Sequence, residues 1–173
     1  MPKEVNIDIG CGKRADYFVS RAGVDKHGLF ICLDPSEFRC QYMNMYPNLQ
    51  LMRWGASEKG NWELPFANYS IDEANMNFIS DFMDWTGEGQ AYDSIIISLK
   101  RVLKPDGVIH VREPRGTVRY LAEKFEEHGF QATNPVPLEE DVSETSVYLR
   151  NTSKGKADST YCPMEFEARL NRG

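Results

Sequence analysis

Glycines and acids near the start of the chain have the spacing of a nucleoside-binding site. The apolar segment 5–9 runs into Gly10-Cys11-Gly12, and a second apolar run, 29–33, ends at Asp34. Glycines let the backbone approach a ligand where a side chain would collide. An acid about 20 residues further on can accept hydrogen bonds from the two hydroxyls of a ribose. Asp34 also has a structural interpretation, because an acid in this position can cap a following helix.

Three further charged residues lie at predicted strand ends. Asp8 ends the first apolar segment, where a buried carboxylate has few structural uses, so we interpret it as a ligand-binding residue. Arg112 and Glu113 stand at the end of a later predicted strand, at the same edge of the sheet as the predicted ligand site. We interpret them as a surface ion pair, with substrate contact as the alternative.

Strand and helix patterns alternate along the chain, which predicts an α/β fold with a doubly wound, mostly parallel sheet. The predicted strands span 5–9, 29–33, 49–54, 71–78, 108–111, 130–136 and 145–149. The predicted helices span 15–22, 36–46, 92–103 and 117–128. The connection between the last two strands is too short for a crossover helix, so we expect them to pair antiparallel. We expect one domain over 1–151, followed by a tail, 152–173, whose structure the pattern does not assign.

Composition excludes several function classes. The net charge of −6 and the pI near 5.1 argue against a nucleic-acid backbone as the main partner. No apolar run reaches the roughly 20 residues of a membrane span. The N-terminus does not have the pattern of a secretory signal, so we expect the cytoplasm. The four cysteines form no C-x-x-C pair, so no metal site is expected, and Cys11 and Cys32 are interpreted as reduced thiols in or beside strands.

Several blocks, in order and spacing, together resemble the class I S-adenosylmethionine-dependent methyltransferases. The blocks are Asp8-Ile9-Gly10-Cys11-Gly12, Leu33-Asp34-Pro35-Ser36, Gly55-Ala56-Ser57-Glu58, Leu64-Pro65-Phe66, Ser70-Ile71-Asp72-Glu73 and the run from Leu99 to Gly107. The last of these is the most distinctive. The resemblance implies a seven-stranded Rossmann-like sheet of order 3-2-1-4-5-7-6 with its last strand antiparallel.

The resemblance also implies S-adenosylmethionine as the cofactor and a set of residues that bind it. That set is Asp8, Gly10, Cys11, Gly12, Asp34, Pro35, Ala56, Ser57 and Asn77. Asp8 is expected near the cationic amino end of the cofactor, Asp34 at the ribose hydroxyls and Asn77 near the reactive methyl. Ala56 and Ser57 are expected against the adenine. The pattern identifies no catalytic residue.

The leading hypothesis is an enzyme that transfers a methyl group to an unidentified acceptor by in-line displacement, a reaction that relies on positioning and desolvation. Asn77-Phe78-Ile79-Ser80 lacks the Asn/Asp-Pro-Pro-aromatic run typical of methylation at base amino groups, which again argues against nucleic acid. Only four residues precede the first strand, so we expect an open pocket. A partner subunit, a homodimer or a large substrate are the candidates to close it.

Two alternatives stay open. A non-catalytic binding or scaffolding module is suggested by Arg14, where the family commonly has a third glycine, and by Ala56, where it often has an acid. A nicotinamide-dependent dehydrogenase is suggested by the loose pattern Gly10-x-Gly12-x-x-Ala15. The position of Asp8 and the terminal antiparallel strands argue against the dehydrogenase.

Overall fold

The structure is a computed structural model, and it describes residues 4–11, 16–34, 45–55, 62–77, 90–137 and 163–171. The helices are α1 (Asp16–Val24), α3 (Gln90–Val102) and α4 (Arg115–Glu127). The strands are β1 (Glu4–Ile9), β2 (Gly28–Asp34), β3 (Leu49–Arg53), β4 (Ile71–Asn77), β5 (Leu103–Pro114), β6 (Phe130–Ala132), β7 (Val136–Pro137) and β8 (Pro163–Leu170). The predicted helix 36–46 falls almost entirely outside the described residues.

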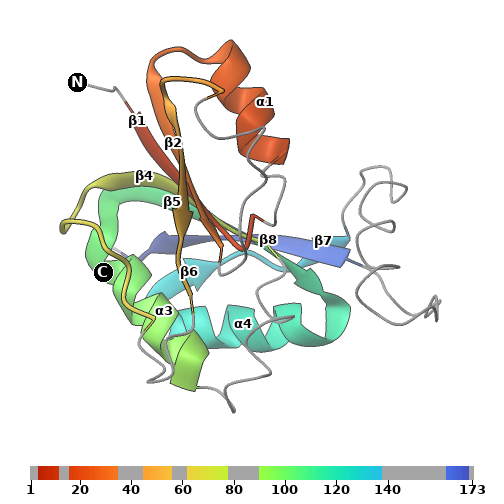
Figure 1. Cartoon of the computed structure of the whole chain (residues 1–173). Helices are drawn as coiled ribbons and strands as arrows, with labels where there is room; N and C mark the ends of the chain where they lie inside the picture. The colour runs from red at the N-terminus through yellow and green to blue at the C-terminus, as the bar shows by residue number, and fades with distance from the viewer. Residues whose placement is uncertain are drawn as a thin grey trace.

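The strands form one mixed sheet in the order β3-β2-β1-β4-β5-β8-β6, and β7 pairs with β8 beside β6. Strands β1 to β5 run parallel to one another, whereas β8 is antiparallel to β5, β6 and β7. Helix α1 lies on one face of the sheet and α3 and α4 lie on the other (Figure 1). The predicted doubly wound α/β fold is therefore confirmed. The prediction of one antiparallel strand in an otherwise parallel strand order is confirmed as well.

Strand alternation divides the sheet into an apolar and a more polar face. Ile7 and Ile9 of β1 are fully buried in the larger core, which also contains the inner faces of α3 and α4. Asn6 and Asp8 point to the opposite face because successive side chains of a strand alternate. On that face, α1 packs its Phe18 ring against Phe30 of β2 in a smaller cluster, with 5.2 Å between ring centroids.

The last antiparallel strand is not the one that the sequence analysis predicted. We assigned that place to 145–149, which lies outside the described residues, whereas the strand between β5 and β6 is Pro163–Leu170. Met164, Phe166 and Ala168 are buried, and the intervening residues face away from the core. This period of two is the pattern of a strand with one apolar face. The sheet therefore includes residues beyond Asn151, where we expected the domain to end.

Smaller differences concern the strands around β8. The predicted strand 130–136 is divided into β6 and β7, which pair with opposite ends of β8. The predicted turn 104–107 lies inside the bounds of β5, but the register with β4 jumps from Ile71↔Leu103 to Glu73↔Val108. Residues 104–107 thus form an irregular segment between the two parts of β5 that pair with β4.

One carboxylate holds together the edge of the sheet opposite the predicted binding site. Asp72 accepts a hydrogen bond from the backbone N–H of Val5 at 2.8 Å and pairs with the Nζ of Lys104 at 2.7 Å. These contacts join the beginnings of β1 and β4 to the irregular part of β5. Asp72 has the structural role that its position at the start of β4 indicates.

Candidate functional site

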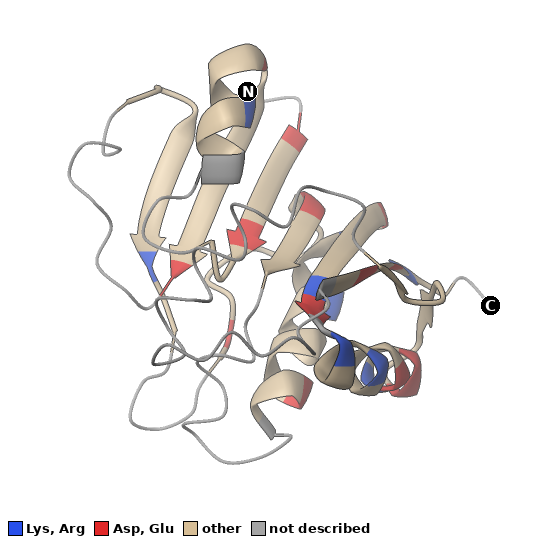
Figure 2. Cartoon of the chain, turned by 90° about the vertical axis from the view of Figure 1, so that its right-hand side faces the viewer, with Lys and Arg blue, Asp and Glu red and all other residues tan. Residues whose placement is uncertain are grey.

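The predicted ligand-binding acids lie at neighbouring strand ends on one edge of the sheet. Asp8 near the end of β1 pairs in register with Cys32 of β2 and Asn75 of β4. Asp34 ends β2, two residues beyond Cys32, and Asn77 ends β4. Acidic residues colour the tips of the two adjacent arrows in Figure 2. In open α/β sheets, ligands bind outside the carboxyl ends of the strands.

Asp8 is a buried carboxyl group with one specific side-chain donor. It is only 1% exposed, and Asn77 Nδ2 donates a hydrogen bond to its Oδ1 at 2.6 Å. Burial raises the pKa of Asp8 from 3.8 to about 7, and the hydrogen bond from Asn77 and the charge of Arg112 oppose this rise. The nearby carboxylates Asp34 and Glu73 add to it. A cation brought to this carboxyl group would stabilise its ionised form.

Gly10 turns the chain away from the sheet directly after β1. Its φ of 80° lies in the left-handed region that favours glycine, and its N–H donates to the carbonyl of Leu33 at 2.9 Å. This bond keeps the turn against the end of β2, so bare backbone lies between Asp8 and Asp34. The geometry is that of a strand tip that a ligand can approach closely.

The thiol of Cys11 follows this turn and contacts the neighbouring strand. Burial raises the pKa of Cys11 well above its usual value, and a side-chain hydrogen bond with Cys32 raises it further. The neutral thiol is a poor nucleophile. This agrees with the interpretation of both cysteines as reduced thiols, and both are free cysteines in the structure.

Asp34 is also buried, at 5% exposed, and its main chain fixes the end of the next strand. The Asp34 carbonyl accepts a hydrogen bond from the N–H of Trp54 at 2.9 Å, directly after β3. Its register partner on β3 is Arg53. Two buried carboxyl groups therefore lie at adjacent parallel strand ends, on either side of the Gly10 turn.

Four predicted cofactor-binding residues lie outside the described residues: Gly12, Pro35, Ala56 and Ser57. Arg14, which motivates the non-catalytic alternative, also lies outside them. The structure thus brings together Asp8, Gly10, Cys11, Asp34 and Asn77 from the predicted set.

The expected ion pair between Arg112 and Glu113 does not form. Glu113 is fully buried on the α3–α4 face, whereas Arg112 lies on the opposite face, where its Nε donates to Glu165 Oε2 of β8 at 3.3 Å. Adjacent strand residues point to opposite faces, so strand alternation alone could have excluded the pair. Arg112 is also the register partner of Asn77, which extends the row of polar strand ends across β4, β5 and β8.

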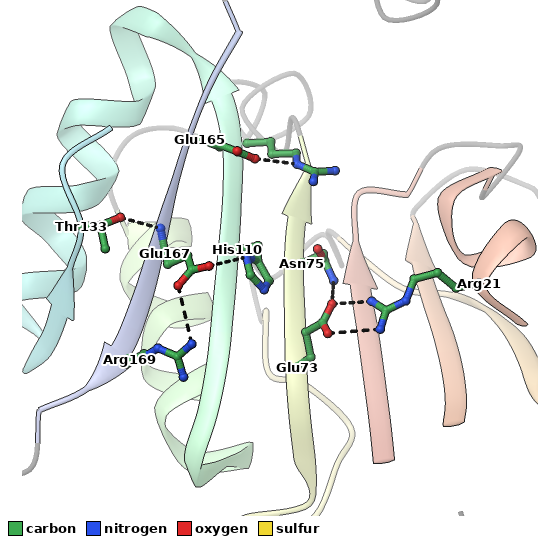
Figure 3. A network of polar contacts seen from close by, with 9 residues as sticks. Arg21, Glu73, Asn75, His110, Thr133, Glu165, Glu167 and Arg169 are labelled. Carbon is green, nitrogen blue, oxygen red and sulfur yellow. Dashed lines mark hydrogen bonds and ion pairs between the residues drawn. The ribbon is translucent and has the colours of Figure 1, made fainter. Parts of the chain in front are cut away.

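A polar network continues this row along the α1-side face of the sheet (Figure 3). Arg21 of α1 makes a two-point contact with Glu73 of β4, which also accepts a hydrogen bond from Asn75 at 3.0 Å. In the same network, Nδ1 of His110 on β5 lies 3.6 Å from Oε1 of Glu167 on β8. Sequence analysis did not identify this network because its members come from four separate elements.

Comparison with solved structures identifies the fold. The chain is similar to a SAM-dependent methyltransferase from Aquifex aeolicus, with 16% identity, a TM-score of 0.65, and coverage of 98% of this chain and 84% of that one. It is similar to the 16S rRNA methyltransferase KamB, with 14% identity, a TM-score of 0.63, and coverage of 98% and 89%. It is also similar to precorrin-6y C5,15-methyltransferase from Geobacter metallireducens, with 19% identity, a TM-score of 0.57, and coverage of 99% and 81%.

No family model matches the sequence, and no curated protein matches it. Within the described segments, no helix combines the length and the apolarity needed to cross a membrane. The similarity therefore lies in the fold, and it extends over nearly the whole chain at low sequence identity. The expected fold is confirmed: this chain has the Rossmann-like α/β fold of the S-adenosylmethionine-dependent methyltransferases.

Proposed function

We propose that the protein binds S-adenosylmethionine at the carboxyl ends of β1, β2 and β4 and transfers its methyl group to an acceptor. The observation that carries this proposal is the pair of buried carboxyl groups, Asp8 and Asp34, at adjacent parallel strand ends. The Gly10 turn lies between them with φ 80°. A site of this kind suits a ligand with both a cationic group and a vicinal diol.

The described residues fit the two ends of such a ligand. The raised pKa of Asp8 reflects a buried carboxyl group without a full counter-charge, which an ammonium group would supply. Asp34 would accept hydrogen bonds from the two ribose hydroxyls, as acids do at this place in doubly wound folds. Gly10 and Cys11 would offer backbone to the ligand between these two points.

When bound, S-adenosylmethionine supplies an electrophilic methyl group on a sulfonium centre. The residues of this chain orient the ligand and exclude water, and these effects account for much of the rate of a displacement in which reactants are aligned. Asn77, fixed by its bond to Asp8 at 2.6 Å, would lie beside the reacting group. No described residue is assigned as a nucleophile or a general base.

Calorimetry with S-adenosylhomocysteine tests the proposal. The wild type should bind, and Asp34→Ala should weaken binding by about 1.5–3 kcal/mol, the value typical of hydrogen bonds to a charged group. The matched control is Asp106→Ala, an exposed acid in the irregular part of β5 at the opposite edge, which should leave affinity unchanged. No binding to the wild type at millimolar ligand would favour the non-catalytic module. Equal affinities of wild type and Asp34→Ala would refute the ribose role.

The non-catalytic alternative rests on Arg14 and Ala56, which lie outside the described residues, and no structural observation favours it. The acceptor is a separate question. Two of the similar structures are methyltransferases for 16S rRNA and for a precorrin, so the fold accommodates very different acceptors. The chemistry of the acceptor must be inferred from the residues beside the proposed cofactor site.

A further inference from the structure

An ion pair between α1 and β4 lies on the face of the sheet that carries Asp8. Arg21 Nη1 of α1 lies 2.5 Å from Glu73 Oε1 of β4, and its Nη2 lies 3.3 Å from Oε2. Arg21 Cζ also lies 5.2 Å from the centre of the Phe30 ring and 5.7 Å from that of the Phe18 ring. Figure 3 shows Arg21 reaching over β1 to Glu73. Contacts with β4, β2 and α1 itself therefore fix the position of this positive charge above the sheet.

Glu73 and Asp8 are diagonal neighbours on this face. Asn6 of β1 is the register partner of Glu73, and Asp8 is the register partner of Asn75. Register partners on adjacent strands point to the same face, and the strand spacing and rise put the Cα atoms of Glu73 and Asp8 about 8 Å apart. At that separation, in a partly buried environment, the negative charge of Glu73 opposes ionisation of Asp8.

Glu73 is ionised over the pH range in which Asp8 titrates. Burial raises the pKa of Glu73, but hydrogen bonds from Arg21 and Asn75 and the charge of Arg21 more than offset burial. With a further contribution from the charge of His110, the pKa of Glu73 lies below its ordinary value of 4.5. Strand β1 adds no donor, because Asn6 is 1% exposed and its side-chain nitrogen and oxygen have no hydrogen-bond partner within the described residues. The main counter-charge of this anion therefore comes from α1.

We propose that Arg21 is a positioning residue of the cofactor site: by pairing with Glu73 it offsets the charge of that carboxylate, so that Asp8 can ionise and bind the cationic end of the cofactor. The inference rests on the proposed function, because it identifies a residue of α1 that governs the same site. An ammonium group is held by the ionised form of Asp8. An unpaired anion at Glu73 would oppose that form, so Arg21 acts through Glu73 and not on the ligand.

The other charged and titratable groups around Asp8 also bear on its ionisation. Burial is the largest influence on the pKa of Asp8 and raises it, whereas among the charges Arg112 lowers it and Asp34 and Glu73 raise it. The groups come from every element packed around Asp8, namely Cys11 after β1, Asp34 on β2, Glu73 on β4, His110 and Arg112 on β5, and Arg21 on α1. Among them, Arg21 can be replaced without altering any strand end at the proposed ligand site.

Titration of Asp8 in the ligand-free full chain tests the proposal. Carboxyl-carbon NMR of isotope-labelled aspartate gives the signal of Asp8, which is identified by its loss in Asp8→Asn. Arg21→Met should raise the pH midpoint of this signal by about 0.5–1 unit, the effect of removing one charge at a partly buried distance, and Glu73→Gln should lower the midpoint. Arg21→Lys keeps the charge and should retain the wild-type midpoint. The double variant Arg21→Met/Glu73→Gln should return the midpoint towards that of the wild type.

A purely structural role of the ion pair predicts a different result. Arg21→Met would then lower the free energy of unfolding and leave the Asp8 midpoint unchanged, which would overturn the proposal. Should Arg21→Met not fold, Glu73→Gln and the double variant give the same test, because neither leaves an unpaired carboxylate at position 73. The proposal requires the midpoint of Glu73→Gln to lie below that of the double variant, and equal midpoints would overturn it.

The matched control is Arg169→Met, which breaks another arginine–glutamate pair on the same face. Arg169 pairs with Glu167 on β8, two strands further from β1 than Glu73 is, so the Asp8 midpoint should not change. Calorimetry with S-adenosylhomocysteine then links the charge to binding. Arg21→Met should bind about three- to tenfold more weakly than the wild type at pH 6 and equally at pH 9.

The pH dependence of binding separates the two proposals. A loss of affinity in Arg21→Met that is the same at pH 6 and pH 9 would show a distorted site and overturn the role proposed for Arg21. Absence of S-adenosylhomocysteine binding to the wild type would instead refute the proposed function, whereas the midpoint of Asp8 in the ligand-free protein still decides whether Arg21 controls its ionisation.

Discussion

The buried carboxyl group of Asp8 makes the stability of this protein depend on pH in a predictable direction. The pKa of Asp8 is about 7 in the folded protein, against an ordinary value of 3.8. Between pH 3.8 and about 7, Asp8 keeps its proton in the folded chain but releases it in the unfolded chain. The contribution of Asp8 to the free energy of unfolding is therefore fully present below pH 3.8 and is lost as the pH rises to about 7.

The magnitude follows from the width of this window. About three pH units, at about 1.4 kcal/mol each, give about 4 kcal/mol. Asp8→Asn removes the titration and keeps a side-chain oxygen that can accept the hydrogen bond from Asn77. The variant should therefore gain stability relative to the wild type by about 4 kcal/mol as the pH increases from 4 to 8.

Urea unfolding of wild type and Asp8→Asn across this pH range measures the difference directly. Effects of other titrating groups cancel in the comparison of the two proteins at each pH. Asp106→Asn, at an exposed position, provides the control and should show a difference independent of pH. If the difference between Asp8→Asn and wild type is the same at pH 5 and pH 8, Asp8 is not a buried carboxyl group and the reasoning fails.

Two other predictions concern ligand binding and packing. Since a cationic ligand prefers ionised Asp8, the affinity for S-adenosylhomocysteine should weaken by up to about tenfold for each pH unit below 7. Calorimetry in buffers of different ionisation enthalpy should detect the release of a proton on binding. Absence of proton release would show that Asp8 does not contact the ligand. Gly107→Ala should lower the free energy of unfolding by about 1–3 kcal/mol, because the added Cβ would lie 2.7 Å from Leu103 Cγ and 2.9 Å from the Asp72 carbonyl oxygen. The matched control is Gly116→Ala, where no atom lies within 4 Å, so thermal melting should show this variant to be at least as stable as the wild type.

Much of the fold could be predicted because each regular element has a strong local pattern. The inner face of α3 has apolar residues at helical spacing, such as Ile95, Ile96 and Leu99, and the predicted helix differs from the observed one by two residues at its start and one at its end. Helix α4 could be placed similarly, with Gly129 after its end at a φ of 84°. These signals lie within one turn or strand and need no knowledge of distant contacts.

Strand β8 could not be assigned because its polar positions have meaning only in the sheet. Glu165 and Glu167 face Arg112 and His110 of β5, more than 50 positions earlier in the chain. Without that neighbour, the alternating acids resemble a solvated tail. The same limit applies to the candidate site. The ends of the predicted strands indicated Asp8 and Asp34 as site residues. The bond from Asn77 to Asp8, however, depends on the register of β1 against β4, which no local pattern encodes.

The position of β8 between β5 and β6 constrains how the protein can assemble. Within the described residues, β6 pairs only with β8, and one side of β5 is covered only by β8. During synthesis on the ribosome, β5 and β6 cannot pair with β8 until residues 163–170 have emerged. Until then β5 presents an unsatisfied backbone edge, the feature that templates association between chains. Nascent or truncated chains that lack β8 are thus the forms most exposed to aggregation.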